Sequence, residues 1–192
     1  DHIGRVGKIV REGFRGTIYS TPETKEIAMP MLADALKVME MNAKQLGLNA
    51  PQDKVAEEPL YTLADLDTAF SLWKTIPYHT ETKVGEDFSV YLKDAGHILG
   101  SSMYDFKYNG KKIVFTGDSG NSPTPLLKDT EAITDADYLV VDSVYGDRNH
   151  ESKEDRDARF RQIVTETIQS GGTLVIPAFS IERTQVILYE LN

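Results

Sequence analysis

One histidine and one aspartate in the middle of the chain have the residue types and the placement for metal chemistry. His97 lies in a turn rich in glycine and serine, and Asp118 follows the end of an apolar segment. Imidazole and carboxylate groups that meet at one edge of a sheet can hold a divalent metal such as zinc. On spacing alone, such residues are more often solvated surface groups than metal ligands.

The chain between His97 and Asp118 predicts a compact β-hairpin. Residues 102–108 and 111–116 have alternating side chains, and Asn109-Gly110 between them favours the positive φ angles of a tight turn. A hairpin brings its two ends together. His97 and Asp118 are therefore predicted to be neighbours at one end of a sheet.

Composition limits the available chemistry. The chain has 192 residues, of which 40% are hydrophobic and 27% charged, as in ordinary globular domains. It contains no cysteine, so any metal must be held by His, Asp or Glu. The net charge of −9 argues against a generally basic nucleic-acid binder, although two divalent cations would add positive charge where a phosphate must sit. We expect a cytoplasmic protein with no membrane partner, because no signal peptide and no apolar run of about 18 residues is visible.

Helices dominate the prediction for the first half of the chain. A short helix should end at Gly13, and a longer one should run from Pro22 to about Gly47, with Pro30 kinking or dividing it. Residues 48–60 predict an exposed connection. Another helix begins after Thr62, and its expected apolar face comprises Leu63, Leu66, Phe70 and Trp73.

Strands and helices alternate in the second half, which predicts an α/β or mixed α+β fold. Residues 138–142 and 173–177 are apolar runs that predict fully buried strands, with a helix capped by Ser152 between them. Asp142 ends the first of these runs, as Asp118 ends an earlier strand. Polar groups gathered where strands end are typical of active sites in α/β proteins.

Four segments, taken in order, resemble the metallo-β-lactamase superfamily and specifically its β-CASP nucleases: AGHILGS, TGDSG, VDSVYGDRNH and IPAFSIERTQ. The resemblance covers nearly the whole chain and is weakest over residues 40–85. It is closer to the RNA-processing, polyadenylation-endonuclease-like branch than to the DNA-repair branch. It implies an incomplete αββα sandwich truncated at both ends, with a metallo-β-lactamase domain over residues 1–178 and the start of a β-CASP domain at 179–192.

The resemblance also implies a site with two zinc ions. Asp1-His2 is similar to the last two residues of the family's histidine-rich motif, so Asp1 and His2 would hold one zinc. His97 would help to hold the other, and Asp118 would bridge the pair. Asp142 corresponds to an acidic residue that orients a later histidine, which protonates the leaving group. By this resemblance the catalytic residues are Asp1, Asp118 and Asp142.

The function implied is hydrolysis of RNA phosphodiester bonds by a hydroxide that two zinc ions activate, with a homodimer as one expected state. Two alternatives stay open: a small-molecule hydrolase of the same superfamily acting on esters or thioesters, and an inactive paralogue that serves as a scaffold in an RNA-processing complex. The chain departs from the family at Asp142, where glutamate is commoner, and at Glu182, where glycine is frequent.

Four further positions have less specific expectations. His79 matches no motif and is expected to be a surface residue. His150 belongs to the third motif, and a structural role is as well supported as a catalytic one. Ser101 and Ser102 would either contact a substrate phosphate or complete the turn that holds His97.

Overall fold

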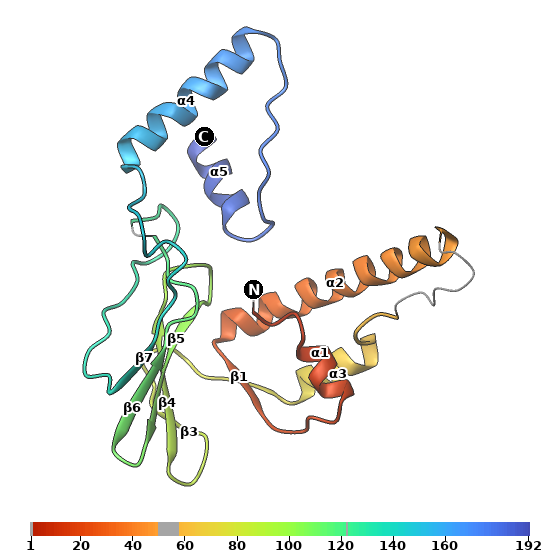
Figure 1. Cartoon of the computed structure of the whole chain (residues 1–192), viewed down its shortest axis with the longest axis vertical. Helices are drawn as coiled ribbons and strands as arrows, with labels where there is room; N and C mark the ends of the chain where they lie inside the picture. Colours follow the sequence, from red (N-terminus) through yellow and green to blue (C-terminus); the bar gives the residue numbers. More distant parts are fainter. Residues whose placement is uncertain (1, 50–57, 122) are drawn as a thin grey trace.

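Helices lie toward both ends of the chain, and strands follow one another between them, in the computed structural model, which describes residues 2–49, 58–121 and 123–192 (Figure 1). The elements are α1 (Val6–Arg11), β1 (Ile18–Ser20), α2 (Pro22–Asn49), α3 (Leu63–Ser71), β2 (Trp73–Thr75), β3 (Thr82–Lys83), β4 (Phe88–Asp94), β5 (Ser102–Tyr108), β6 (Lys111–Phe115), β7 (Tyr138–Val140), α4 (Lys153–Gln169) and α5 (Arg183–Leu191). The mixed α/β class predicted from the sequence is confirmed. Most of the exposed connection predicted over residues 48–60 lies outside the described residues.

The larger sheet has five strands in the order β3-β4-β5-β6-β7. Its neighbours are antiparallel except for β6 and β7, which are parallel. The predicted hairpin is its centre, because β5 and β6 pair from Tyr104 opposite Phe115 to Tyr108 opposite Lys111. Asn109 and Gly110 have φ angles of 49° and 70°, so the turn has the left-handed geometry that this dipeptide favours.

The smaller sheet pairs β1 and β2 in parallel, and α1, α2 and α3 lie around it (Figure 1). Its core joins α2 to α3 and β2 through a cluster of buried side chains: Ala28, Leu32, Leu36, Tyr61, Leu66 and Trp73. The helix α2 is continuous through Pro30, so the predicted division of the helix there is wrong, while a kink at Pro30 stays a prediction. Buried residues on both sides of Pro30 are packed into the same core, which offsets the one backbone hydrogen bond that proline removes.

The helix α3 begins as predicted and ends earlier than its apolar pattern indicated. Thr62 and Asp65 form a capping box at its start. Leu66 is fully buried, but Leu63 is 57% exposed. Trp73 belongs to β2, where its indole N–H donates to Ser20 Oγ at 2.8 Å. The apolar periodicity therefore continued past the end of the helix into a strand.

A second core lies under the larger sheet, where Ile76, Val90 and Leu92 are buried and Tyr104 and Phe106 pack against them. Val90 and Leu92 alternate along β4 as the sequence predicted. The segment after β2 joins this core through Ile76 and then passes beside the sheet. The following residues, Tyr78 and His79, are therefore held close to the end of β4.

Two apolar segments that the sequence predicted as buried strands are not buried. The strand β7 forms, but its three residues are exposed, and Val141 after it is 56% exposed. Residues 173–177 form no strand, and Val175 is 81% exposed. The predicted helix between them is present as α4 with its Ser152 cap, but it contains no buried residue. The apolar runs have strand composition, yet nothing in the described parts of the chain covers them.

Among the described residues, no helix is both long enough and apolar enough to cross a lipid bilayer.

Candidate metal centre

The structure brings three of the residues singled out from the sequence to one place. His2 Nε2 lies 3.7 Å from Asp118 Oδ1, and His97 Nε2 lies 3.6 Å from Asp118 Oδ2. Each imidazole thus faces a different oxygen of one carboxylate. His2 precedes α1, His97 follows β4, and Asp118 follows β6, so segments distant in sequence meet at Asp118.

The separations between these atoms fit zinc better than a direct hydrogen bond. Hydrogen bonds from nitrogen to oxygen are usually about 2.7–3.2 Å long. A tetrahedral zinc with ordinary bond lengths separates an imidazole nitrogen from a carboxylate oxygen by about 3.4 Å. Among the described residues, no group of three or more histidine, aspartate or glutamate side chains is arranged to hold a metal ion, and His2 and His97 each face one oxygen of Asp118. The prediction for Asp1 lies outside the described residues.

The turn that carries His97 is fixed from within by Ser101. The backbone N–H groups of His97 and Ile98 donate to Ser101 Oγ at 3.1 and 3.2 Å. Of the two roles left open by the sequence, the structure therefore gives this hydroxyl the completion of the turn. The hydroxyl of Tyr78 donates to the Ser101 carbonyl at 2.7 Å. Burial raises the pKa of Tyr78, which keeps this donor protonated.

The start of α2 also forms hydrogen bonds to the turn that carries His97. The hydroxyls of Thr21 and Thr24 both donate to the carbonyl of Gly100, at 2.8 and 2.9 Å. Thr21 is fully buried. The turn that carries His97 is therefore bound to the start of α2 as well as to the larger sheet.

The turn that carries Asp118 lies directly against the turn that carries His97. The backbone N–H of Gly120 donates to the Ala95 carbonyl at 2.8 Å. A Cβ atom at position 120 would overlap the carbonyl of Gly96, so this approach requires glycine. The short distance between the two turns sets the distance between His97 and Asp118.

Asp142 forms one hydrogen bond to the segment just before Asp118 and one within its own loop. Its N–H donates to Thr116 Oγ1 at 3.0 Å, and its Oδ1 accepts from the N–H of Val144 at 3.0 Å. Capping its own loop was one of the roles considered for Asp142 from the sequence. The bond to Thr116 holds this loop against the chain just before Asp118.

The other residues of the third motif pack against one another at the surface. The rings of His150 and Tyr145 have centroids 4.6 Å apart, and the Arg148 guanidinium lies 5.3 Å from the Tyr145 ring centroid. His150 therefore has a structural contact within its own motif.

Glu182, which the sequence marked as a departure from the family, has a perturbed carboxyl group. Burial raises the pKa of this carboxyl, and the charges of Arg183 and His97 offset that rise in part. Its Oε1 is buried and has no hydrogen-bond partner in the described parts of the chain. The sequence drew attention to Glu182 only because it lies in the fourth motif, at a position where the family often has glycine.

His79 is a residue that the sequence did not place near the site. Its side chain is 53% exposed, as expected of a surface residue, but its Nε2 lies 2.7 Å from Glu131 Oε1. The two residues are distant in sequence, and no motif contains either of them. No sequence signal could have paired them.

The chain is similar along its whole length to nucleases from bacteria and eukaryotes. It is 32% identical over 191 residues to ribonuclease TTHA0252 of Thermus thermophilus, and covers 40% of that protein. It is 33% identical over 195 residues to the cleavage and polyadenylation specificity factor 73 of Drosophila melanogaster, and covers 26% of it. It is 31% identical over 195 residues to the endoribonuclease YSH1 of Eremothecium gossypii, and covers 24% of it. No family model matches the chain.

The mixed α/β fold agrees with the fold class that the resemblance implied, and the relatives agree with its RNA-processing branch. All of this chain aligns with proteins named for cleaving or processing RNA. The resemblance to the β-CASP metallo-β-lactamase nucleases of RNA processing is therefore confirmed. The chain spans less than half the length of these relatives.

Proposed function

We propose that the protein is a zinc-dependent ribonuclease in which His2, His97 and Asp118 bind two metal ions. The observation that carries this proposal is the placement of two imidazoles against the two oxygens of Asp118, at 3.7 and 3.6 Å. A carboxylate that faces two ligands in this way is suited to bridge two cations. Two of these relatives are named ribonuclease and endoribonuclease, which supports RNA as the substrate.

In this proposal the protein's own residues would bind the metal ions and orient the group that protonates the leaving oxygen. Asp118 would hold the metal ions together with His2 and His97, and the hydrogen bond from Gly120 to Ala95 fixes the distance of Asp118 from His97. When bound, the two zinc ions would supply activation of water and neutralise charge that develops on the phosphate. Asp142, held beside this site by Thr116, would orient the group that protonates the leaving oxygen.

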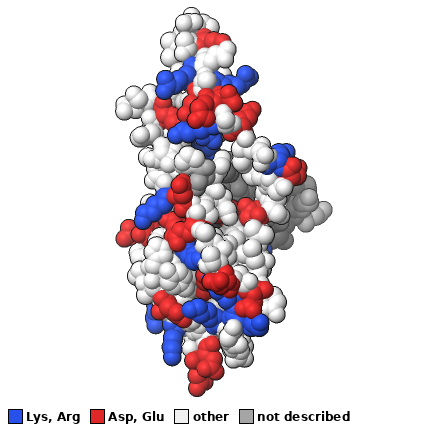
Figure 2. All heavy atoms as spheres, turned by 90° about the vertical axis from the view of Figure 1, so that its left-hand side faces the viewer, with Lys and Arg blue, Asp and Glu red and all other residues white. Residues whose placement is uncertain are grey.

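The charge of the molecule makes the metal ions important for binding RNA. The net charge is −9, and Figure 2 shows acidic and basic side chains interspersed over the face that it displays. On the described surface of that face no continuous basic stripe follows the molecule. Because phosphate contacts dominate affinity for nucleic acid, the local positive charge for the cleaved phosphate would come from the metal site.

The test measures zinc content and RNA cleavage of the full-length protein for the wild type, Asp118→Asn and Asp137→Asn. We expect about two zinc ions per wild-type chain and cleavage that a chelator abolishes. Asp118→Asn should weaken zinc binding by more than about 100-fold and abolish cleavage, because it removes a shared ligand. Asp137 is a matched control, since its carboxylate pairs with Lys111 at 2.6 Å on the same sheet.

Two results would overturn the proposal. Zinc binding without RNA cleavage would favour the small-molecule hydrolase of the same superfamily. Wild-type protein that binds no zinc would favour the inactive scaffold. A homodimer stays a prediction, and the molar mass of the same preparations in solution measures it.

A further inference from the structure

A segment without regular secondary structure, residues 129–134, crosses both turns of the candidate metal centre; we call it the strap. Thr130 Oγ1 donates to the carbonyl of Ala95 at 2.9 Å and lies 3.4 Å from the carbonyl of Gly120. Ala95 precedes His97 and Gly120 follows Asp118. One hydroxyl of the strap thus contacts the turns that carry both residues.

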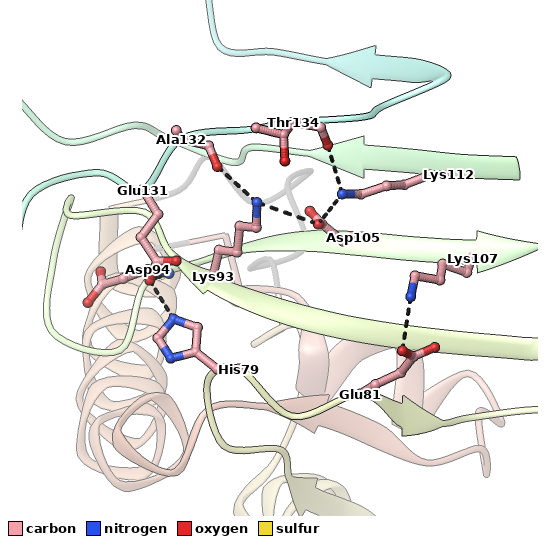
Figure 3. A network of polar contacts seen from close by, with 10 residues as sticks. All are labelled: His79, Glu81, Lys93, Asp94, Asp105, Lys107, Lys112, Glu131, Ala132 and Thr134. Atoms are coloured by element: carbon pink, nitrogen blue, oxygen red, sulfur yellow. Dashed lines mark hydrogen bonds and ion pairs between the residues drawn. The ribbon is translucent and has the colours of Figure 1, made fainter.

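The strap is bound to the sheet at the two residues that follow Thr130. Glu131 and Asp94 form two hydrogen bonds: the Glu131 N–H donates to the Asp94 carbonyl at 3.1 Å, and the Asp94 N–H donates to Glu131 Oε1 at 3.0 Å. Further along, Lys93 Nζ donates to the Ala132 carbonyl at 2.8 Å. Figure 3 shows these groups lying along one edge of the larger sheet.

His79 fixes the strap from outside. Its Nε2 lies 2.7 Å from Glu131 Oε1, the same oxygen that accepts from Asp94 (Figure 3). Its backbone N–H donates to the Leu92 carbonyl at 2.9 Å, and its φ angle is 59°. A non-glycine residue with such a φ is uncommon and needs support from its surroundings. The neighbouring Tyr78 bonds the His97 turn, so one short segment contacts both the strap and that turn.

We propose that His79 is a positioning residue for the metal centre: by holding Glu131 it fixes the strap, and the strap holds the turns of His97 and Asp118 at a constant distance. The inference rests on the proposed zinc site for its functional meaning. The structural part of the inference is that His79 keeps the two turns well ordered, and this part does not depend on a bound metal.

A positioning role and a merely stabilising role predict different measurements. The His79 and Glu131 side chains are 53% and 33% exposed, and exposed ion pairs contribute little to the free energy of unfolding. Metal ligands tolerate little displacement, and loss of groups that orient them usually weakens metal binding about 10–100-fold. His79→Ala should therefore weaken zinc binding while leaving the melting temperature almost unchanged.

The experiment compares three variants of the full-length protein with the wild type. His79→Ala removes the contact with Glu131, and His79→Gln keeps an N–H donor on a side chain of similar length. Lys107→Ala is the matched control, because it removes an exposed pair with Glu81 of 2.9 Å on the same sheet (Figure 3). The readouts are hydrogen exchange over residues 94–101 and 117–121 without metal, and zinc affinity by competition with a chelator.

We expect exchange in both turns to be about 10-fold faster in His79→Ala, through more frequent local opening, and zinc affinity to fall about 10–100-fold. His79→Gln should recover most of both losses, and Lys107→Ala should match the wild type. Unchanged exchange in His79→Ala would overturn the inference, as would equal effects of His79→Ala and Lys107→Ala. Wild-type protein that binds no zinc would refute the proposed function, while the exchange comparison would still decide the role of His79.

Discussion

Asp105 provides the sharpest stability prediction. It lies on β5 and is 2% exposed, with its Oδ2 2.9 Å from Lys112 Nζ and 3.9 Å from Lys93 Nζ. The two lysine side chains are themselves 18% and 13% exposed. One carboxylate therefore compensates two largely buried ammonium groups (Figure 3).

We expect Asp105→Asn to lower the free energy of unfolding by about 3 kcal/mol, because removing one partner of a buried pair leaves charge uncompensated at a cost of about 3–5 kcal/mol. The low end applies because each ammonium keeps a carbonyl acceptor, Ala132 for Lys93 and Thr134 for Lys112. For a chain of this size, the melting temperature should fall by about 6–12 °C.

Urea unfolding at neutral pH measures this effect, with the midpoint and its slope recorded for each variant. The control is Glu81→Gln, which removes the carboxylate from the half-exposed pair with Lys107 and should lower the free energy of unfolding much less than Asp105→Asn, because water screens this pair. A loss in Asp105→Asn no larger than that of the control would refute the reasoning. It would mean that the two ammonium groups need no buried counter-charge.

Three further outcomes are expected. Thr62→Ala should cost about 1 kcal/mol, because it removes the capping box of α3, and the urea midpoint measures it. Glu182→Gly should stabilise the protein by about 1 kcal/mol in the same assay, because Glu182 has φ 64°, a strained angle that glycine adopts freely. Burial raises the pKa of Glu131, but hydrogen bonds from Asp94 and His79 outweigh it and leave that pKa below its usual value. The resulting stabilisation is complete above the unfolded pKa of about 4.3 and is lost as the pH falls through the lower folded value.

Each of these outcomes has its own control. Thr68→Ala is the control for the cap, since Thr68 bonds within α3 and lies away from its start; equal effects of the two variants would contradict the capping argument. A Glu182→Gly variant that unfolds at lower urea than the wild type would contradict the strain argument. For the acid effect, the free-energy difference between wild type and Glu131→Gln should shrink as the pH falls below about 4.5, and a constant difference would contradict it.

Local signals in the sequence predicted the parts of the fold that local chemistry determines. The Asn109-Gly110 turn placed the hairpin and, through it, the proximity of His97 and Asp118. The capping residues Thr62 and Ser152 marked the starts of their helices. These features depend on backbone angles and hydrogen bonds within a few residues, which is the range over which sequence patterns are informative.

Features that depend on distant partners could not be predicted. The pairing of His79 with Glu131 joins two loops and has no local pattern. Burial of residues 138–142 and 173–177 was inferred from their apolar composition, but burial needs a second layer, and none covers them in the described parts of the chain. Composition indicates that a strand can be buried and contains no information on what would cover it.

The exposed strand β7 has a consequence for handling the protein at high concentration. Among the described residues β7 pairs only with β6, so its other edge presents free backbone groups beside exposed apolar side chains. Such an edge is a template for strand pairing between molecules. Copies of this chain should therefore self-associate edge to edge, and the monomer fraction should fall as the solution is concentrated. Light scattering across a dilution series would detect this association before visible precipitation.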